Sequence, residues 1–556
     1  MPKLIINRFD GGLAPRYFDG SQHLKKVGAE GSYAGGLIDP FWFNGLLTPP
    51  VTELGNPTGE STLVAERVLG RIVVDDSAID TPAFFAIEEG PTAASTKKIH
   101  KINSSTGEVT TAAFATTTLA GAHSGHTNIE GASDIVVYQK NGSKFLFYSW
   151  CDATDGDVGI ITTAAASQDE DFMTTTPTGF SATAFADGDY PIILEVADNN
   201  YLYMCQKNFV HKYDGTTAGG ANGTFTANAI DLPVNWTIRD ARDGRGKMWI
   251  LATNSLVSQG TSANKGLIRQ AGVFVWDRIT TGAKFEDFLP INGASAVHAL
   301  FFFDGVPHVF TSGHEIANAY GATNASHVVE LRAFNGREFE VIKQVGVGNN
   351  PHRNGVTTKD GMITWLGADG YWYSYGKAYN EIAPCVVQIG KLPIQAGGTT
   401  TVRVGSVVRA ETTGSASHYF ASYYQDNAST PQKLSLWNPF DMAETTTSAT
   451  YKSLVKELPK LSRITGITIY YPTFTSAASD TLGIKLYKNY SSSSSFNGTA
   501  TYASLSTIGW KYFPITLDNT NAIQVGIEWT STATAVSASP RISRIEIDYI
   551  TTTKLF

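Results

Sequence analysis

A short acidic run in the first third of the chain resembles a calcium loop. It reads Asp152-Ala-Thr-Asp155-Gly-Asp157. Calcium is bound by oxygen ligands, and closely spaced aspartates supply them. The run lacks the alternating spacing and the distal Glu of an EF-hand loop, and Asp, Gly and Thr are also common in turns. We therefore predict a hairpin turn and no metal site here.

Histidines give a second pattern with metal-binding character. His123 and His126 are three residues apart, but a zinc site needs further ligands, and no HExxH motif accompanies the pair. His298, His308 and His314 fall around the strands of one repeat unit, where a structural role is the simpler interpretation. The sequence thus predicts no bound metal and no cofactor.

Motifs for catalysis are missing from the chain. It has no G-x-S-x-G elbow, no P-loop and no dinucleotide-binding fingerprint. Glycosidases need two carboxylates at a set separation, and a sequence does not reveal that separation. We predict no catalytic residues and no enzymatic activity, and we keep a propeller-fold polysaccharide hydrolase as an alternative.

The densest cluster of charges is Arg239–Lys247, which reads RDARDGRGK. Because its signs alternate, the residues can pair with one another in water. We interpret the cluster as a solvated, self-paired turn, with a contact between subunits as the alternative.

Composition restricts the partners and the compartment. The net charge is −8, which argues against a broad nucleic-acid-binding face because phosphate contacts require clustered Lys and Arg. Cys151, Cys205 and Cys385 are far apart and odd in number, which favours reduced thiols over a disulfide scaffold. The N-terminus lacks the apolar core of a signal peptide, and no apolar run is long enough to span a bilayer. We expect a soluble protein made in a cytoplasm.

The elements that carry these residues are short strands with recurring turn signals. Tyr201–Gly215 alternates apolar residues at Tyr201, Tyr203 and Cys205, turns at Gln206–Asn208, and ends a second strand at Asp-Gly. Such a pattern predicts a β-hairpin. Similar strand-and-turn segments recur along the chain: Lys97–Gly107, Val273–Gly282, Val328–Gly336, Tyr371–Gly376 and Lys433–Pro439.

A second set of apolar strands recurs at intervals of 51 to 63 residues. These strands begin at or next to Ile135, Ile192, Met248, Ala299, Met362 and His418. Units of that length with several strands each are typical of β-propeller blades. We predict an all-β fold with a propeller of about seven blades over residues 61–442. Closure of the propeller needs a distant strand, for which Leu4–Phe9 and Thr62–Val68 are candidates. A large sandwich or two stacked all-β domains is the alternative.

The last segment, residues 443–556, changes character and predicts a C-terminal β-sandwich. If Trp510, Tyr512 and Trp529 were exposed, they would stack on sugars, although Trp529 has apolar neighbours typical of a core. Five strands are expected here: Ile467–Tyr471, Leu482–Leu486, Trp510–Ile515, Val525–Trp529 and Ile545–Ile550.

Residues 1–60 form no blade and predict an extended N-terminal arm. Glycine pairs, prolines and clustered aromatics exclude a regular helix or a central strand. We expect the arm to lie in a groove of its own propeller or of a neighbouring subunit. The candidate assembly residues are Phe9, Gly11, Gly12, Leu13, Phe41, Trp42 and Phe43.

This N-terminus resembles the opening of tail nozzle or hub proteins of short-tailed phages and related virion β-propeller proteins. The residues that carry the resemblance are Asn7, Gly11, Gly12, Leu13, Gly45, Leu46, Pro49 and Pro50. The blades themselves show no close match to that family.

The resemblance implies a structural virion protein that forms a homo-oligomeric ring around the DNA exit channel of the tail. Its expected partners are other tail and connector proteins, with passive passage of viral DNA, and its expected location is the virion, after assembly in the host cytoplasm. A receptor- or glycan-binding tail protein is a further alternative.

Overall fold

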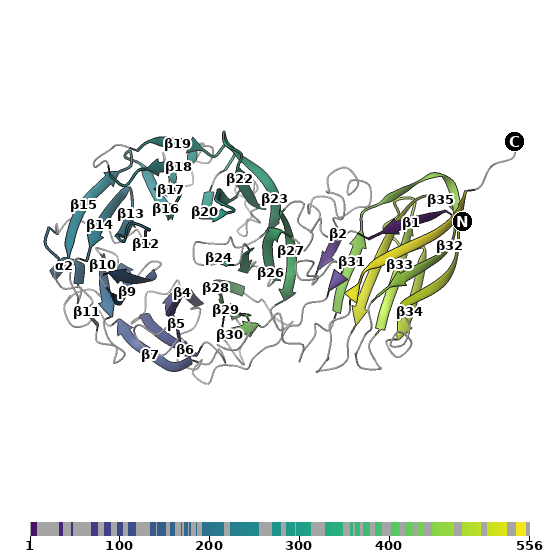
Figure 1. Ribbon diagram of the computed structural model, residues 1–556, viewed down its shortest axis with the longest axis horizontal. Coiled ribbons are helices and arrows are strands. Elements are labelled where there is room, and N and C mark those ends of the chain that lie inside the picture. The colour runs from purple at the N-terminus through teal and green to yellow at the C-terminus, as the bar shows by residue number, and fades with distance from the viewer. Residues whose placement is uncertain are drawn as a thin grey trace, which may run out of the picture.

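The described part of the chain consists almost entirely of β-strands, with one helical turn, α2 (Phe172–Thr175). The strands form a ring of sheets and a second β-domain beside it (Figure 1). The all-β propeller prediction is therefore confirmed. The computed structural model describes residues 2–7, 33–36, 46–47, 68–75, 83–89, 97–103, 109–117, 134–140, 142–151, 156–161, 168–169, 172–175, 177–179, 185, 192–215, 223–254, 270–279, 285–294, 296–312, 328–347, 356–359, 362–366, 371–377, 384–391, 402–411, 417–425, 432–437, 448–471, 481–501, 509–530 and 541–551.

Seven sheets of these residues make up the ring, and each is an antiparallel meander of consecutive strands. Blades one and two contain β4 (Val68–Asp75), β5 (Ala83–Glu89), β6 (Lys97–Asn103), β7 (Val109–Thr117), and β8 (Ile135–Lys140), β9 (Ser143–Cys151), β10 (Gly156–Ile161), β11 (Gln168–Asp169). Blades three and four contain β12 (Ile193–Val196), β13 (Leu202–Gln206), β14 (Phe209–Asp214), β15 (Thr224–Asp231), and β16 (Trp236–Gly244), β17 (Lys247–Asn254), β18 (Gln270–Trp276), β19 (Asp287–Pro290). Blades five to seven contain β20 (Ala296–Phe303), β21 (Val306–Ser312), β22 (Val328–Phe334), β23 (Phe339–Val347), then β24 (Val356–Lys359), β25 (Met362–Leu366), β26 (Tyr371–Lys377), β27 (Pro384–Lys391), then β28 (Val402–Glu411), β29 (Ser417–Gln425), β30 (Gln432–Trp437).

The first strand of each blade lies at the centre of the ring and contacts the first strand of the next blade (Figure 1). Because β28 of blade seven also contacts β4 of blade one, the ring closes by packing of sheet on sheet. The predicted closure by Leu4–Phe9 or Thr62–Val68 is wrong for the described residues. Lys3–Ile6 pairs with the C-terminal domain, and Val68 begins β4 itself.

Each blade is covered by a neighbour on both faces, as β13 illustrates. All five of its residues are buried. Leu202 and Met204 pack with side chains of blade two, whereas Tyr203 and Cys205 pack with side chains of blade four. Successive side chains of a strand point to opposite faces, so one strand contributes to two interfaces. The hairpin predicted for Tyr201–Gly215 is confirmed by the pairing of β13 with β14.

In the C-terminal domain the long strand β35 pairs with different strands along its two halves. The first half of β35 pairs with β32, as in Phe513 with Ile467, and its second half pairs with β33, as in Ile527 with Ile484. All four side chains belong to one buried core. The strands are β31 (Ser448–Ser453), β32 (Lys456–Tyr470), β33 (Thr481–Lys488), β34 (Phe496–Thr501), β35 (Trp510–Thr530), β36 (Arg541–Ile542) and β37 (Arg544–Thr551).

Three short strands of the N-terminal segment complete the C-terminal domain. They are β1 (Lys3–Ile6), β2 (Tyr33–Gly36) and β3 (Leu46–Leu47), which pair with β37, β31 and β36. β2 also contacts β27 of blade six. The predicted domain boundaries at residues 60 and 442 fall outside the described residues. Among the helical residues that the structure describes, no segment is long and apolar enough to cross a membrane.

Candidate functional site

All seven residues predicted for the assembly arm lie outside the described residues: Phe9, Gly11, Gly12, Leu13, Phe41, Trp42 and Phe43. The strands before and after them, β1, β2 and β3, lie on the C-terminal domain of the same chain. For these strands the predicted groove of the propeller or of a neighbouring subunit is wrong. The edges of the C-terminal sheets offer unpaired N–H and C=O groups, which the N-terminal strands satisfy.

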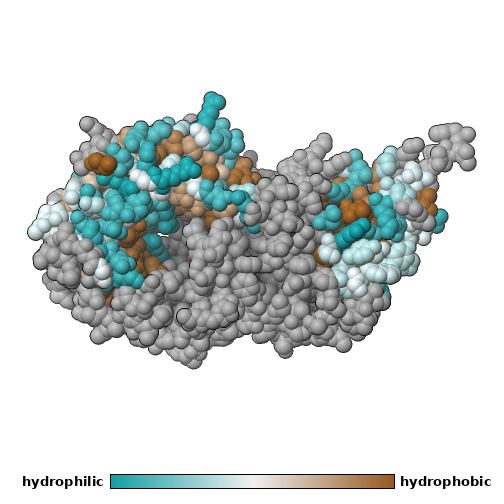
Figure 2. Space-filling view, viewed as in Figure 1, coloured by the Kyte–Doolittle hydropathy of each residue, from teal (hydrophilic) through white to brown (hydrophobic). Residues whose placement is uncertain are grey.

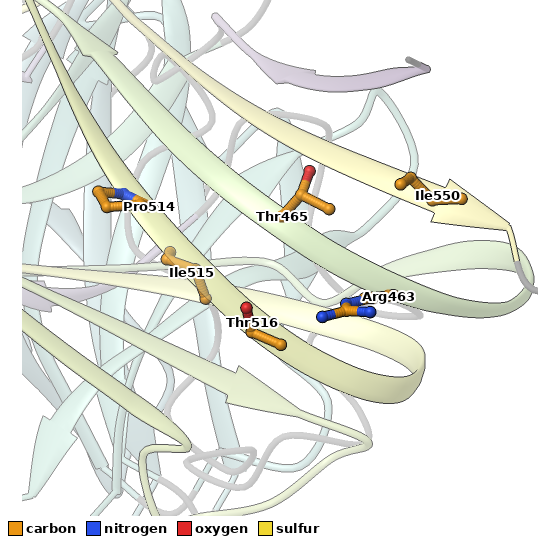
Figure 3. Close-up of a pocket in the computed structure, with 6 residues that line it drawn as sticks. All are labelled: Arg463, Thr465, Pro514, Ile515, Thr516 and Ile550. Carbon is orange, nitrogen blue, oxygen red and sulfur yellow. The ribbon is translucent and has the colours of Figure 1, made fainter.

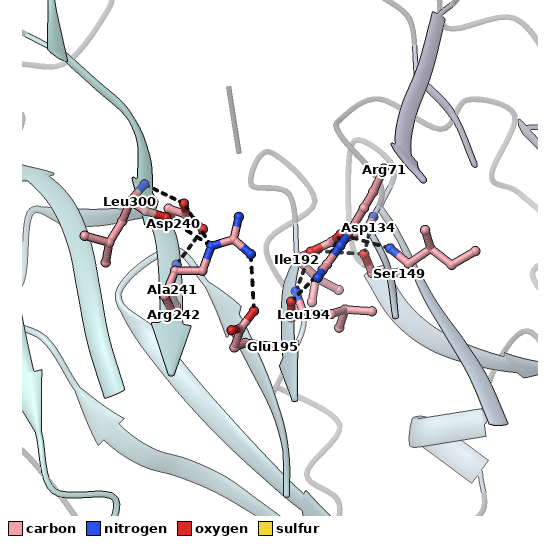
Figure 4. Close-up of polar contacts among 11 residues, drawn as sticks. Arg71, Asp134, Ser149, Ile192, Leu194, Glu195, Asp240, Ala241, Arg242 and Leu300 are labelled. Atoms are coloured by element: carbon pink, nitrogen blue, oxygen red, sulfur yellow. Dashed lines mark hydrogen bonds and ion pairs between the residues drawn. The ribbon is translucent and has the colours of Figure 1, made fainter. Parts of the chain in front are cut away.

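The centre of the propeller holds a group of charged side chains that we call the axial charge cluster: Arg71, Asp134, Glu195, Asp240 and Arg242 (Figure 4). Each comes from the first strand of a blade or, for Asp134, from the residue directly before one. The exposed fractions of these side chains are 20% or lower. The cluster therefore brings both signs of charge together at the inner edge of the blades.

Asp134 joins three blades through one carboxylate (Figure 4). Its Oδ2 accepts a hydrogen bond from the backbone N–H of Leu194 in blade three, at 2.8 Å, and its Oδ1 accepts one from Ile135, at 2.9 Å. Arg71 of blade one donates to Asp134 Oδ1 and to the carbonyl oxygen of Leu194, each at 3.0 Å. The backbone N–H and C=O of Leu194 are thus both hydrogen-bonded to charged side chains of other blades, Asp134 and Arg71.

Asp240 repeats this arrangement between blades four and five. Its Oδ2 accepts from the N–H of Leu300 at 2.8 Å, and its Oδ1 accepts from Ala241 at 2.9 Å. Arg242 Nε donates to the carbonyl oxygen of Leu300 at 3.1 Å and lies 3.5 Å from Asp240 Oδ2. We call these two arrangements the Asp134 staple and the Asp240 staple.

Glu195 follows Leu194 in β12 and contacts the Asp240 staple. Its Oε2 lies 3.7 Å from Arg242 Nη1, and its Oε1 accepts from the N–H of Asp243 at 3.2 Å. Burial raises the pKa of Glu195 and raises that of Asp240 to about 6, against the opposing influence of Arg242. Burial also lowers the pKa of Arg71 to about 10, with Arg242 adding to the effect. Both carboxyl groups therefore hold a proton to higher pH than ordinary carboxyl groups do.

The structure corrects the prediction for Arg239–Lys247. Most of this segment is strand β16 rather than a solvated turn, and Asp240 is fully buried. Only its end turns, at Arg245 and Gly246, whose φ angles are 53° and 72°. Just before this segment the apolar residues Trp236 and Ile238, both buried, alternate with polar residues. That alternation is the signal in the sequence that could have predicted a strand here.

The outer face of the C-terminal sheet has a second polar network, around Glu546 of β37. Its Oε2 accepts from Lys3 Nζ of β1 at 2.7 Å and from the hydroxyl of Tyr470 at 3.1 Å, and Arg544 forms an ion pair with Oε1. Burial by itself would raise the pKa of Glu546, but these partners lower it below its usual value. The network holds the N-terminal strand on the sheet.

Two aromatic side chains are exposed on the same face. The exposed fraction is 51% for Trp510 and 41% for Tyr512, two residues apart in β35. Beyond them lies a hollow of about 350 Å³ between β32, β35 and β37, lined by Arg463, Thr465, Pro514, Ile515, Thr516 and Ile550 (Figure 3). Trp529 lies farther along β35. Figure 2 shows apolar and hydrophilic residues interspersed on the described surface of the C-terminal domain in this view.

Among the other residues considered from the sequence, His308, Asp157 and Cys205 are buried. His308 is buried, with its Nε2 3.3 Å from the hydroxyl of Tyr375 in the next blade. Asp157 is buried and accepts from the N–H of Val158. Cys205 is a free, buried thiol. Among the described residues no three His, Cys, Asp or Glu side chains are grouped to hold a metal ion. His123, His126, Asp152, Asp155 and His314 lie outside the described residues.

No protein-family model and no curated protein matches this sequence. Solved structures resemble it in fold. A glycoside hydrolase family 43 arabinoxylan arabinofuranohydrolase from Bacillus subtilis is 11% identical, with a TM-score of 0.29 over 90% of this chain and 98% of that one. The Dos1 propeller is 11% identical, with a TM-score of 0.32 over 71% and 94%. Polysaccharide lyase Uly1 is 10% identical, with a TM-score of 0.39 over 79% and 98%.

The prediction that the chain is not an enzyme is contradicted, because the structures of similar fold are mainly enzymes, including the hydrolase and the lyase above. Missing sequence motifs are weak evidence in this fold, since a propeller brings carboxylates together from separate blades. At such low identities and TM-scores the likeness concerns the fold and assigns no activity to this chain.

Proposed function

We propose that this chain is a structural component of a tailed-phage virion, a tail nozzle- or hub-like protein that assembles into a homo-oligomeric ring around the DNA exit channel. The observation that carries the proposal is the occurrence of the Phe9–Leu13 motif and a seven-blade propeller in one chain. Other tail and connector proteins would be its partners, in a virion assembled in the host cytoplasm.

The physical properties of the chain suit such a role. The Asp134 and Asp240 staples tie the inner strands of neighbouring blades together, which favours a rigid body. The net charge of −8 disfavours tight contact with DNA phosphates and so suits passive passage of DNA.

The test is the assembly state of the full-length protein, by mass photometry followed by electron-microscope class averages. Deleting residues 1–50 is unsuitable, because it would remove β1, β2 and β3 from the C-terminal sheets. The variant to use replaces Phe41, Trp42 and Phe43 together by Ser, and the matched control is Val234→Ser, at a propeller side chain that is 81% exposed.

We expect closed rings with an axial channel for the wild-type protein and the control, and monomers for the triple variant. Rings that persist in the triple variant would contradict the role of the arm. A wild-type protein that stays monomeric, alone and with purified connector protein, would contradict the ring.

A second candidate function is a propeller enzyme acting on polysaccharide. The observation that favours it is that Glu195 and Asp240 lie within 4 Å of the same Arg242 guanidinium, and a buried carboxyl with a raised pKa can act as a general acid. Release of reducing ends or unsaturated products from a polysaccharide panel tests it. Activity that Glu195→Gln abolishes, in a protein that still unfolds at the wild-type temperature, would support it, and an inactive wild-type protein would contradict it.

A further inference from the structure

We propose that the outer face of the C-terminal sheet is a binding site for a neutral oligosaccharide. The site begins at Trp510 and Tyr512 and continues along β35 past Pro514 to the hollow at Thr516 (Figure 3). This inference is independent of ring assembly and of catalysis at the propeller axis.

The exposed side chains of β35 form one row that begins with two aromatic rings. Trp510, Tyr512, Pro514 and Thr516 are exposed at alternate positions of β35, whereas Phe513 between them is buried in the core. Alternate residues of a strand share a face and lie about 7 Å apart, so the row from the first to the last spans about 20 Å. That length suits an extended chain of a few sugar rings.

Tyr512 is held in place before any ligand arrives. Its hydroxyl donates to the carbonyl oxygen of Thr465 at 3.1 Å, and its ring lies over Gly466, where an added Cβ would clash with it. Gly466 therefore leaves room for a ring lying on the sheet. A ring already fixed in its bound position loses little conformational entropy on binding.

The groups around the two rings suit the chemistry of a sugar. Sugars present apolar C–H faces together with hydroxyl groups, and they need both ring surfaces and hydrogen-bonding groups nearby. Trp510 and Tyr512 supply the surfaces, while Arg463, Thr465 and Thr516 line the hollow beside them. An amphipathic surface of this kind differs from the broad apolar patch that a stable protein partner covers.

The charges on this face favour a neutral sugar. The charged groups of this face have partners of opposite sign within the chain. Glu546 pairs with Lys3 and Arg544, and Arg463 Nε lies 3.3 Å from Asp518 Oδ1. Lys3 Nζ also lies 4.0 Å from Asp548 Oδ1. With Asp548 included, three positive and three negative side chains are paired on this face. Among the described residues the face therefore has no excess charge that would select an acidic sugar.

The experiment uses the full-length protein on an array of neutral and acidic oligosaccharides, followed by calorimetric titration of the strongest ligand. Three variants are compared with the wild type: Trp510→Ala, Tyr512→Ala and Gly466→Ala. The control is Tyr490→Ala. Tyr490 lies in the turn between β33 and β34, where its hydroxyl donates a hydrogen bond to Glu457.

We expect binding of neutral oligosaccharides, stronger for longer chains, with a loss of about 10-fold or more in affinity for Trp510→Ala and Tyr512→Ala. Gly466→Ala is expected to weaken binding although it removes no contact with the sugar, because it displaces the ring of Tyr512. Tyr490→Ala should bind as the wild type does.

Three outcomes would overturn the proposal: an array without any ligand, binding restricted to acidic sugars, or full affinity in the double variant Trp510→Ala/Tyr512→Ala. Thermal unfolding of each variant separates loss of the site from loss of the fold. A normal melting temperature with lost binding assigns the effect to the face itself. Self-association that disappears in Trp510→Ala without any sugar binding would identify a second copy of the chain as the occupant instead, and would also overturn the proposal.

Discussion

The axis of the propeller and the outer face of the C-terminal sheet both gather side chains capable of chemistry, but they use them in different ways. At the axis, Asp134 and Asp240 accept hydrogen bonds from backbone N–H groups of the next blade. On the outer face, Trp510 and Tyr512 keep about half of their surface exposed. A polar group whose bonds are made within the chain stabilises the fold, whereas ring surface without a partner is available to a ligand.

The largest effect is expected from Asp240→Ala. The substitution removes the acceptor of the Leu300 and Ala241 N–H groups from a buried position. It also removes one of the two carboxylates beside the Arg242 guanidinium. We expect a loss of about 3 kcal/mol in the free energy of unfolding, measured by denaturant titration. The control is Asp287→Ala, because exposed Asp287 accepts, among the residues that the structure describes, only from Phe288 in its own strand. Its effect should stay below about 0.5 kcal/mol. Equal effects of the two substitutions would mean that the Asp240 staple adds nothing across the blade boundary.

A smaller effect is expected from Ser149→Ala in the Asp134 staple. The Ser149 hydroxyl accepts from the N–H of Asp134 at 2.9 Å and donates to the carbonyl oxygen of Ile192 in the next blade at 2.7 Å. Its loss should cost about 1–2 kcal/mol of unfolding free energy. Ser374→Ala is the comparison, since Ser374 pairs with Thr364 within one blade. A smaller loss for Ser149→Ala than for Ser374→Ala would argue against the importance of bonds between blades.

Acid pH should act on the outer face through Glu546. Because its pKa is lowered in the folded protein, its contribution to stability is present above the usual value of 4.5 and is lost as pH falls through the lowered value. We expect the amide hydrogens of β1 to exchange faster as the pH drops through this range, after correction for intrinsic exchange rates. In Glu546→Gln this pH dependence should vanish. A dependence that persists in the variant would exclude Glu546 as its origin.

The smallest effect on stability is expected from Trp510→Ala, one of the two substitutions that should weaken binding about 10-fold or more. Because the side chain is 51% exposed, we expect a change below about 0.5 kcal/mol in the free energy of unfolding. Phe513→Ala, at the buried side chain on the inner face of the same strand, serves as the contrast and should lower the melting temperature clearly. A large loss of unfolding free energy for Trp510→Ala would show that the Trp510 ring stabilises the fold. It would argue against the ring being available to a ligand.

The blades were predictable because each buries apolar side chains on both faces, and that requirement leaves a repeated pattern in the chain. The pattern did not indicate which strand of its blade each recurring segment forms. Ile135 and Ala299 lie in first strands, whereas Met248, Met362 and His418 lie in second strands. Apolar alternation indicates that a strand is present, but it does not give the strand's place in the sheet, which depends on pairing with distant residues.

The C-terminal domain shows the same limit. Trp510–Ile515 and Val525–Trp529 were predicted as two strands and are the two halves of β35. Asn519 lies between them with a φ angle of 55°, a local signal typical of a turn. Pairing of both halves with neighbouring strands carries the strand through this point, so tertiary contacts override the local preference.

The sequence by itself determined that this protein is an all-β chain with about seven repeated units and a distinct C-terminal domain, because burial imposes its period on neighbouring residues. Only the tertiary structure decided that the N-terminal strand completes the C-terminal sheet and that Arg71, Glu195 and Asp240 meet at the propeller axis. Those contacts join residues far apart in the chain, and their energies depend on burial and on partners that no local pattern specifies.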